Sequence, residues 1–413
     1  MFSWAAAMNI WIINPFDNLP SEGYRPMRFW LMAESFARHG ANVVYWTSDF
    51  SHANKKKRVK THEVFPPFKV VELPALAYKR NVSIARIRSH LKLAKDFARS
   101  ARDRTASGEL ALPDLIVASS PPLSLVREAH RFAREVGAKV IVDVMDAWPE
   151  TFERIVPKWM LWPIRRMAKS NYLQAAAITT VAKRYCDLVR SYGYSGDVRL
   201  FYHGIELSKE APQIKSVVSP LKVVYAGSLG RSYDLATAIK AIGQMKGAAV
   251  LDIAGKGERE EELKKLAKSL PQGLVRFHGY LSKDALDELL SSADIGLVPM
   301  DGASCVGVPY KFADYAKYAL PMASSLGGEC AELLKSFGAG AEYAFGDADS
   351  LEKALFEIAE DLTSFKAASL KMAEEKLDAV KIYDEYVKFA LSGTSKLVNT
   401  SEAKFGIIID NSI

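Results

Sequence analysis

Short apolar runs alternate with amphipathic segments along the first half of the chain. The run at residues 10–13 predicts a strand, and a loop rich in turn formers follows at residues 16–26. Residues 27–39 have helical periodicity and end before Gly40, and the next apolar run, at residues 43–46, predicts a second strand. Strand, helix and strand in this order form a βαβ unit, which implies a parallel sheet.

The same alternation continues to about residue 205. Further strands are predicted at residues 115–119, 140–144 and 175–181, and helices at residues 85–104, 123–136 and 182–192. We therefore expect residues 8–205 to form one doubly wound α/β domain of the Rossmann type.

A second series of the same kind begins near residue 221. It predicts strands at residues 223–226, 249–254, 275–278, 295–299 and 321–324, with helical patterns between them. The fold class is therefore α/β, with a second Rossmann-like domain at residues 206–364. Residues 365–392 are predicted to form a helix that crosses back to the first domain, and residues 393–413 a tail.

Composition narrows the class of protein. Apolar residues make up 49% and charged residues 25% of the 413 positions, as in a soluble globular protein. Three scattered cysteines have no metal-ligand spacing, which argues against a zinc module and for a reducing compartment. No apolar run approaches the ~18 residues of a membrane-spanning helix, and the start lacks the features of a signal peptide. These features predict a cytoplasmic protein.

Charge is distributed unevenly. Residues 1–210 hold 32 basic and 20 acidic residues, a net of +12, whereas the remainder holds 23 and 28, a net of −5. Such asymmetry predicts that the first half faces an anionic partner. No nucleic-acid motif is present, so an anionic membrane surface is the partner we expect, and an ordinary solvated basic face is the alternative.

Two segments of the second domain have the pattern of a phosphate site. Gly227, Ser228 and Gly230 follow a strand directly, and Lys256 follows the next strand. A tight turn without a ligand is the alternative for these glycines. Farther on, the backbone N–H groups of Val306, Gly307 and Val308 are expected near a helix start, with Lys311 and Asp314 in its first turns. An ordinary helix start is the alternative there.

In the first domain, polar residues follow two predicted strands. Asp146 and Trp148 come just after the strand at residues 140–144, where a carboxylate faces the ligand side of a parallel sheet. Asn14, Gly23 and Arg28 surround the first loop, where the alternatives are a turn or packing role. No metalloprotease motif or nucleophile elbow is present, and no Asp-x-Asp pair stands where a divalent metal would bind a nucleotide sugar, so we expect neither a metal nor a cofactor.

Four short motifs in this order resemble those of the bacterial family-4 glycosyltransferases of the GT-B fold, in the capsule and O-antigen branch. The motifs are Ser119-Ser120-Pro121-Pro122, Asp146-Ala147-Trp148-Pro149-Glu150, Tyr225-Ala226-Gly227-Ser228-Leu229-Gly230 and Val308-Pro309-Tyr310-Lys311-Phe312-Ala313-Asp314-Tyr315. The resemblance covers residues 8–392 and implies two domains facing across a cleft. It departs from the wider family at three positions: Val306 stands in place of an acid, and Ser228 and Tyr233 in place of an Arg–Lys pair.

The resemblance implies retaining, metal-independent transfer of a sugar from a nucleotide-diphosphate sugar, a UDP-sugar, to a glycan in cell-surface polysaccharide synthesis. Asp146 would orient a sugar, and Arg231 and Lys311 would stabilise the leaving diphosphate. Three residues would contact the acceptor: Asn14, Arg28 and Trp148. The acceptor implied is linked to a polyprenyl diphosphate on the cytoplasmic face of the cell membrane. Trp159 and Trp162, beside basic residues, match a peripheral membrane enzyme. A non-catalytic nucleotide-sugar-binding protein and a nucleotide-sugar epimerase are the alternatives.

Overall fold

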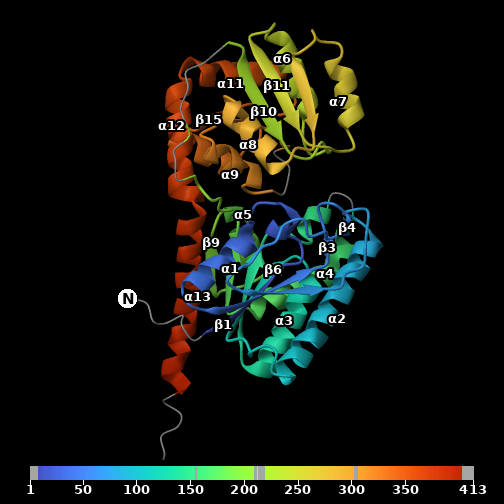
Figure 1. The fold of residues 1–413 in the computed structure, drawn as a ribbon, viewed down its shortest axis with the longest axis vertical. Helices are drawn as coiled ribbons and strands as arrows, with labels where there is room; N and C mark the ends of the chain where they lie inside the picture. The colour runs from blue at the N-terminus through green and yellow to red at the C-terminus, as the bar shows by residue number, and fades with distance from the viewer. Residues whose placement is uncertain (1–7, 154–155, 209–211, 213–218, 302–305, 402–413) are drawn as a thin grey trace, which may run out of the picture. The chain divides into compact units, whose positions relative to one another are not determined.

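The computed structural model describes residues 8–153, 156–208, 212, 219–301 and 306–401. The chain divides into two compact units, which Figure 1 shows as a ribbon. The first, unit 1, comprises Met1–Thr180, Arg184–Phe201 and Val380–Ile413, and the second, unit 2, comprises Val181–Lys183 and Tyr202–Ala379.

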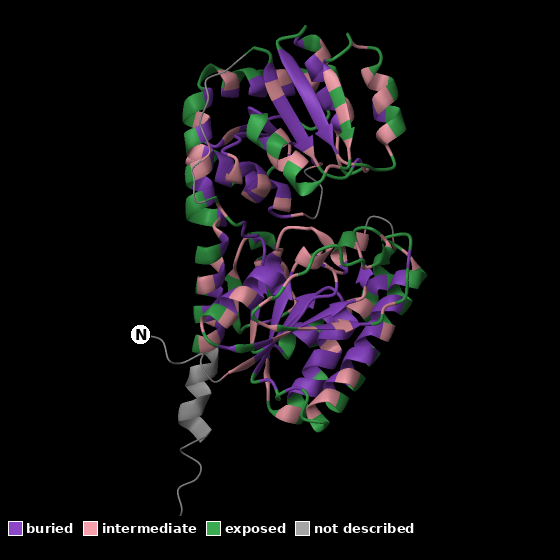
Figure 2. Cartoon of the chain, in the orientation of Figure 1, coloured by how far each residue is buried: buried purple, intermediate pink, exposed green. Residues whose placement is uncertain are grey.

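Unit 1 is built on a seven-stranded sheet in which all strand pairs are parallel. In spatial order the strands are β5 (Lys69–Leu73), β2 (Asn42–Ser48), β1 (Asn9–Ile13), β6 (Leu115–Ser120), β7 (Lys139–Val144), β8 (Ala177–Thr180) and β9 (Asp197–Leu200). The central strands are buried on both faces, which explains why they read as continuous apolar runs (Figure 2).

Helices and short elements connect these strands. The helices are α1 (Arg28–Arg38), α2 (Ile84–Ala106), α3 (Leu123–Val136), α4 (Trp162–Leu173) and α5 (Lys183–Ser191), with short 3-10 helices at Pro20–Glu22, Glu150–Phe152 and Lys158–Leu161. Strands β3 (Phe50–Ser51) and β4 (Lys56–Lys57) form a separate antiparallel pair. Local signals set the helix ends: Ser83 caps α2 by accepting from the N–H of Arg86, and Gly137 ends α3 in the left-handed conformation.

Aromatic side chains form much of the unit 1 core. Trp11 of β1 stacks on Phe132 of α3 with ring centroids 5.2 Å apart, and Trp46 and Phe97 complete the group. All four side chains are almost fully buried. Each such ring contributes roughly 1.5–3 kcal/mol through burial, so this contact fixes α2 and α3 against the sheet.

A buried ion pair joins the elements of unit 1. The Arg28 guanidinium is fully buried and donates to both carboxylate oxygens of Asp143, at 3.1 and 2.8 Å, and to the carbonyl of Phe201 at 2.9 Å. Thr179 also donates to Asp143, at 2.7 Å. The prediction that Arg28 contacts the acceptor is therefore wrong: its charge is used entirely inside the protein.

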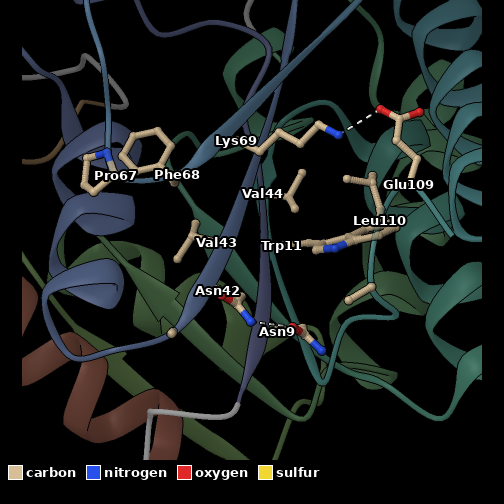
Figure 3. A pocket seen from close by; sticks show the side chains of 12 residues that line it. Asn9, Trp11, Asn42, Val43, Val44, Pro67, Phe68, Lys69, Glu109 and Leu110 are labelled. Carbon is tan, nitrogen blue, oxygen red and sulfur yellow. Dashed lines mark hydrogen bonds and ion pairs between the residues drawn. The ribbon is translucent and has the colours of Figure 1, made fainter.

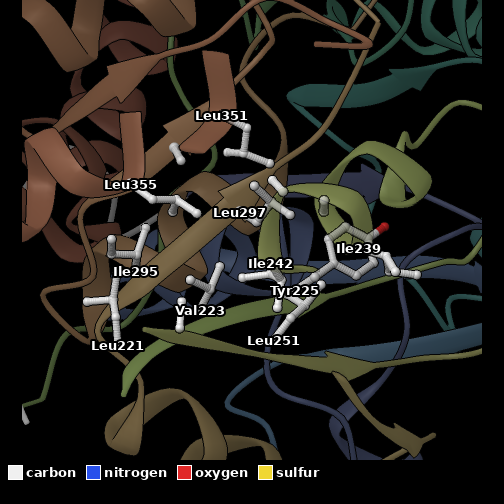
Figure 4. Close-up of a cluster of buried hydrophobic side chains, with 14 of the residues drawn as sticks. Leu221, Val223, Tyr225, Ile239, Ile242, Leu251, Ile295, Leu297, Leu351 and Leu355 are labelled. Carbon is white, nitrogen blue, oxygen red and sulfur yellow. The ribbon is translucent and has the colours of Figure 1, made fainter. Parts of the chain in front are cut away.

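Unit 2 is built on a six-stranded parallel sheet with the equivalent order. Its strands are β12 (Val275–Gly279), β11 (Ala249–Ala254), β10 (Leu221–Ala226), β13 (Ile295–Val298), β14 (Met322–Ser324) and β15 (Gly340–Glu342). Its helices are α6 (Leu235–Gln244), α7 (Glu260–Ala267), α8 (Lys283–Ser292), α9 (Tyr310–Lys317), α10 (Glu329–Phe337), α11 (Ala348–Glu360) and α12 (Leu362–Met372). Figure 4 shows the core between one face of this sheet and its helices, where Val223 and Leu251 of the strands meet Ile239 and Leu355.

The predicted terminal helix is interrupted. A π-helical segment, Ala373–Leu377, follows α12, and Asp378 is extended before α13 (Ala379–Ser401) begins. The break has a clear cause, because Ile205 donates its N–H to Leu377 and accepts from the N–H of Ala379, at 2.8 and 3.0 Å. Helix α13 also extends to Ser401, so the tail expected from residue 393 is helical up to that residue.

Removing the carboxylate of Asp143 should destabilise unit 1 strongly. The variant Asp143→Ala leaves the Arg28 charge buried without its partner, which costs about 3–5 kcal/mol of unfolding free energy. All seven tryptophans lie within the first 162 residues, so tryptophan fluorescence during urea unfolding reports on unit 1. The matched control is Arg38→Ala, which breaks an exposed pair with Asp384 and should cost less than about 1 kcal/mol. Equal effects of the two variants would contradict the assignment.

Candidate functional site

Each sheet has one point at which its strand order reverses. In unit 1 this point lies between β1 and β6, and in unit 2 between β10 and β13. Loops that leave the carboxyl ends of parallel strands diverge at such points and leave room for a ligand. The residues predicted from the sequence follow β1 and β7 in unit 1, and β10, β11 and β13 in unit 2.

Glycines bring two loops of unit 2 into close contact. A Cβ on Gly255 would lie 1.8 Å from the carbonyl oxygen of Gly227, and a Cβ on Gly257 would lie 2.4 Å from that of Leu229. The Leu229 N–H donates to the Lys256 carbonyl at 3.0 Å. The loop of Gly227 therefore lies next to Lys256, which the sequence predicted as a phosphate-binding residue. Gly255 and Gly257 are required because the two backbones pack too closely for a Cβ.

Lys311 of α9 extends toward this pair of loops. It is 9% exposed, and its Nζ has no hydrogen-bond partner among the described residues. The ammonium group lies 4.2 and 4.1 Å from the ring centroids of Tyr225 and Tyr233, and a Cβ on Gly227 would lie 3.2 Å from it. Burial lowers the pKa of Lys311 to about 7, against the raising effect of Asp314. Burying a charged group without a hydrogen-bond partner costs free energy, and a bound anion would reduce that cost.

Tyr225 and Tyr233 were not predicted as site residues. Their rings supply the two faces that hold the Lys311 ammonium, and the Tyr225 hydroxyl donates to the carbonyl of Ser228 at 2.6 Å. Ser228 and Gly230 themselves lie in the surface turn after β10. In the sequence the only signal was the position of both tyrosines beside the glycine turn.

The loop before α9 differs in detail from the expectation. The helix begins at Tyr310 after Pro309, and Gly307 and Val308 are buried. A Cβ on Gly307 would lie 2.0 Å from the Cβ of Ala182, so this glycine permits close packing inside unit 2. Asp314 is half-buried in α9, one turn after Lys311, while Val306 precedes the helix in the loop.

The other predicted cations of unit 2 lie at the surface. The Arg231 side chain is 86% exposed and pairs with Glu258 at 3.2 Å, and Lys256 is also exposed. Surface pairs of this type contribute little to stability, so both side chains can rearrange toward a ligand at small cost.

In unit 1, two predicted residues shape the first loop. The side-chain oxygen of Asn14 is buried and accepts from the N–H groups of Phe16 and Asp17, at 2.7 and 2.9 Å. Gly23 has a φ of 83°, and a Cβ there would lie 2.9 Å from the ring of His62. Both positions are accounted for by loop conformation.

The remaining predicted residues of unit 1 lie in a cluster that the sequence did not reveal. The Arg86 guanidinium carbon lies 4.9 Å from the centroid of the Trp148 ring. The ring centroids of Trp148 and His90 are 5.8 Å apart. We define the Arg86 cluster as Phe16, His52, Lys55, Tyr78, Arg86, His90, Asp146 and Trp148. The spacing of Arg86 and His90, one helical turn apart at the start of α2, was the only sequence signal.

Burial shifts the pKa values of three side chains in the Arg86 cluster. Asp146 is exposed as a whole residue, but neighbouring protein atoms raise the pKa of its carboxyl to about 6, against the lowering effect of Arg86. Burial lowers the pKa values of His52 and His90 to about 3, and the charges of Lys55 and Arg86 contribute. Both imidazoles are therefore neutral at physiological pH.

A pocket of about 370 Å3 lies elsewhere in unit 1 (Figure 3). Asn9, Asn42 and Lys69 line it, and these are the first residues of β1, β2 and β5. It therefore opens at the amino ends of the strands, opposite the edge that carries the Arg86 cluster. The 2.8 Å ion pair between Lys69 and Glu109 lies at its side.

Two kinds of feature are absent from the described residues. No group of histidine, cysteine, aspartate and glutamate side chains there is arranged to hold a metal ion. None of the helices in this part of the chain has the length and apolar character that a bilayer span requires.

Comparison with known families identifies the type of domain in unit 2. Residues 220–361 match the family model described as Glycosyl transferases group 1. Among curated proteins, none matches the chain in sequence. The domain match confirms the predicted enzyme class, a glycosyltransferase, and it contains the glycine loops and Lys311.

Solved structures share the fold over most of the chain. HepE of Anabaena, in complex with UDP and glucose, is 13% identical, with a TM-score of 0.63 over 93% of this chain and 99% of its own. Sucrose-phosphate synthase of Thermosynechococcus elongatus is 14% identical, with a TM-score of 0.70 over 96% and 99%. The lipopolysaccharide outer core galactosyltransferase WaaB is 14% identical, with a TM-score of 0.61 over 94% and 100%. These similarities confirm the predicted GT-B fold with two Rossmann-like domains.

The buried ammonium of Lys311 predicts a specific pH dependence of stability. Below pH 7 the side chain is charged in both the folded and unfolded protein, so the full cost of burying the charge is present. Between pH 7 and about 10.5 only the unfolded chain keeps the proton, and the cost falls by about 1.4 kcal/mol per pH unit. Lys311→Met should therefore stabilise unit 2 most at or below pH 7 and progressively less at higher pH.

Urea unfolding followed by circular dichroism measures this difference, once tryptophan fluorescence has identified the transition of unit 1. Lys256→Met removes an exposed lysine of the same site and serves as the control, with an effect within about 0.5 kcal/mol at every pH. A difference between wild type and Lys311→Met that does not change with pH would contradict the lowered pKa.

Proposed function

We propose that this protein is a retaining glycosyltransferase that moves a sugar from a UDP-sugar to a glycan acceptor without a metal ion. The observation that carries the proposal is the buried Lys311 ammonium, which lacks a hydrogen-bond partner in the described part of the chain. It lies beside the glycine loop of a glycosyltransferase group 1 domain. A nucleoside diphosphate supplies the negative charge that this lysine lacks.

The donor binds in unit 2 in this proposal. The diphosphate lies between Lys311 and the backbone of the loop around Gly227, where the missing side chain leaves room for close approach. Asp314 accepts hydrogen bonds from sugar hydroxyls one helical turn away. Arg231 and Lys256, both exposed, move onto the phosphates when the donor binds. The UDP bound by the structural neighbour HepE supports this choice of nucleotide.

In the proposed reaction, none of the described side chains acts as a nucleophile. The bond between the anomeric carbon and the β-phosphate oxygen breaks, and its electron pair remains on the diphosphate. The acceptor hydroxyl attacks from the same face, and its proton passes to the departing phosphate oxygen. Lys311 and Arg231 stabilise the negative charge on the diphosphate, and Asp146 orients the hydroxyl, so rate enhancement comes from positioning and electrostatics.

We further propose that the acceptor is linked to a lipid and that the enzyme works at the cytoplasmic face of the cell membrane. The segment around the third 3-10 helix of unit 1 exposes Trp159, Met160 and Trp162 by 76%, 51% and 59%. Lys158, with a side chain 76% exposed, and Arg166, 5.5 Å above the Trp162 ring, flank them. Exposed tryptophans beside cations suit the interface of an anionic bilayer. A role in surface polysaccharide synthesis is consistent with the neighbour WaaB.

The start of α2 adds a second exposed apolar stripe. Ile84, Ile87 and Leu91 are 70%, 50% and 41% exposed, and the basic residues Arg88 and Lys92 alternate with them along the helix. This alternation matches an amphipathic helix that lies in a membrane interface.

Transfer of labelled sugar from UDP-sugars to a bacterial lipid extract tests the catalytic proposal. We expect turnover in the presence of EDTA, loss of most turnover in Lys311→Met, and UDP binding weaker by ~1–3 kcal/mol in Asp314→Ala. Lys317→Met, in the same helix, is the control and should retain activity. Nucleotide binding without transfer would favour a binding protein, and interconversion of the sugar would favour an epimerase.

Sedimentation with phosphatidylglycerol vesicles tests the membrane proposal. Binding should decrease steeply between low and high salt, because screening acts over about 10 Å at 0.1 M ionic strength. Replacing Trp159 and Trp162 together by serine should weaken binding, whereas Tyr280→Ser, which alters an exposed aromatic residue of unit 2, should not. The absence of vesicle binding at low salt would favour a soluble acceptor.

A further inference from the structure

Two cations in the Arg86 cluster are held close together. The Lys55 ammonium donates to the side-chain oxygen of Asn81 at 2.6 Å, and the Arg86 guanidinium donates to the backbone carbonyl of the same Asn81 at 2.9 Å. Burial and the neighbouring Arg86 charge lower the pKa of Lys55 to about 8. Bringing like charges together in a partly dry site costs free energy, which a bound anion would recover.

No carboxylate of the described residues forms a salt bridge with either cation. Most other basic residues of unit 1 do have such partners: Arg28 pairs with Asp143, Lys57 with Asp49, and Arg102 with Glu135. Asp146 acts on Arg86 only through space. The remaining neighbours of Arg86 and Lys55 are uncharged: the backbone carbonyl of His52, which accepts from the Lys55 ammonium at 2.5 Å, neutral imidazoles, Tyr78 and aromatic rings.

Aromatic rings and an imidazole contact the Arg86 guanidinium. The Arg86 guanidinium lies over the rings of Phe16 and Trp148, at 5.5 and 4.9 Å, and its Nε donates to Nε2 of His90 at 3.3 Å. These contacts hold the guanidinium in one orientation, so it binds an anion at a low entropic cost. Lys79 and Arg80 of the adjacent loop are exposed and form no salt bridge within the described residues, and they extend the positive field outward.

We propose that the Arg86 cluster binds an anionic group of the acceptor, a phosphate or a carboxylate, beside the hydroxyl that receives the sugar. The inference rests on the proposed transfer function, and it adds the chemical class of the acceptor. Lys55 and Arg86 bind the anion, and Asp146, in the same cluster, orients the neighbouring hydroxyl. The anion belongs either to the diphosphate of a lipid-linked sugar or to an acidic sugar, which have the same charge chemistry at this site.

Calorimetry on the full chain saturated with UDP tests the proposal, because UDP then occupies the Lys311 site. The probes are geranyl diphosphate and methyl glucuronide, and the neutral controls are geraniol and methyl glucoside. We expect one anionic probe to bind and its neutral counterpart to fail. Lys55→Gln and Arg86→Gln should weaken that binding at least about tenfold, the scale of a charge-assisted hydrogen bond. Lys56→Gln, which removes the adjacent exposed charge, should leave it unchanged.

The outcomes are distinct. Binding of geranyl diphosphate alone assigns the anion to a lipid diphosphate, and binding of the glucuronide alone assigns it to an acidic sugar. Failure of both anionic probes, or equal binding by Lys55→Gln and Lys56→Gln, overturns the proposal. If Arg86→Gln does not fold, Lys55→Gln decides, since Lys55 is only half-buried. If UDP does not bind to the wild-type protein, the proposed donor site is contradicted. The comparison of Lys55→Gln with Lys56→Gln would still decide the anion site.

Discussion

The ion pair between Arg28 and Asp143 holds together parts of unit 1 that are far apart in the sequence. Arg28 comes from α1, Asp143 from β7, and the carbonyl of Phe201 from the end of β9. Tyr386 of α13 adds its ring at 6.0 Å from the guanidinium. Because both charges are fully buried, each is tolerable only while the other is in place.

The same rule explains why other cations point to ligands. Arg28 has its full set of partners inside the protein, so it leaves nothing for a substrate. Lys311 is also buried, and among the described residues its ammonium lies beside two aromatic rings without a hydrogen-bond partner, while Arg86 and Lys55 form no salt bridge there. The difference between a structural and a functional cation in this protein is therefore the location of its counter-charge.

The fold could be predicted from the sequence because its central strands are buried on both faces. Because successive side chains of β1, β6 and β10 are buried on opposite faces, these strands are apolar runs in the sequence. The edge strands β5, β9 and β15 were not predicted, since they are short and partly exposed and lack a continuous apolar run. The break at Asp378 was also missed, because it depends on a hydrogen-bonded partner, Ile205, far away in the chain.

Gly227 and Asp146 could be placed from the sequence because each follows a predicted strand, and Lys311 because it follows a predicted helix start, while their roles in binding and catalysis stay predictions. Arg28 could not be judged in this way, because burial of a charge depends on a partner from another strand. The Arg86 cluster was missed for a related reason. Its members come from the first loop, from the loops after β3, β5 and β7, and from α2, and no local pattern connects Phe16, His52 and Arg86.

Helix α13 makes unit 1 dependent on a segment that follows all of unit 2 in the sequence. Its side chains pack on Phe201 and Phe36 through Tyr386, and Asp384 accepts hydrogen bonds from Ser35 and Arg38. On the ribosome, the sheet of unit 1 emerges first, yet this helix arrives only after all of unit 2 has been made. Unit 2 is continuous in the chain apart from residues 181–183 and can fold during that interval. A chain that ends at Phe201 would expose the apolar surface that α13 covers, so unit 1 begins to be translated before unit 2 but is completed after it.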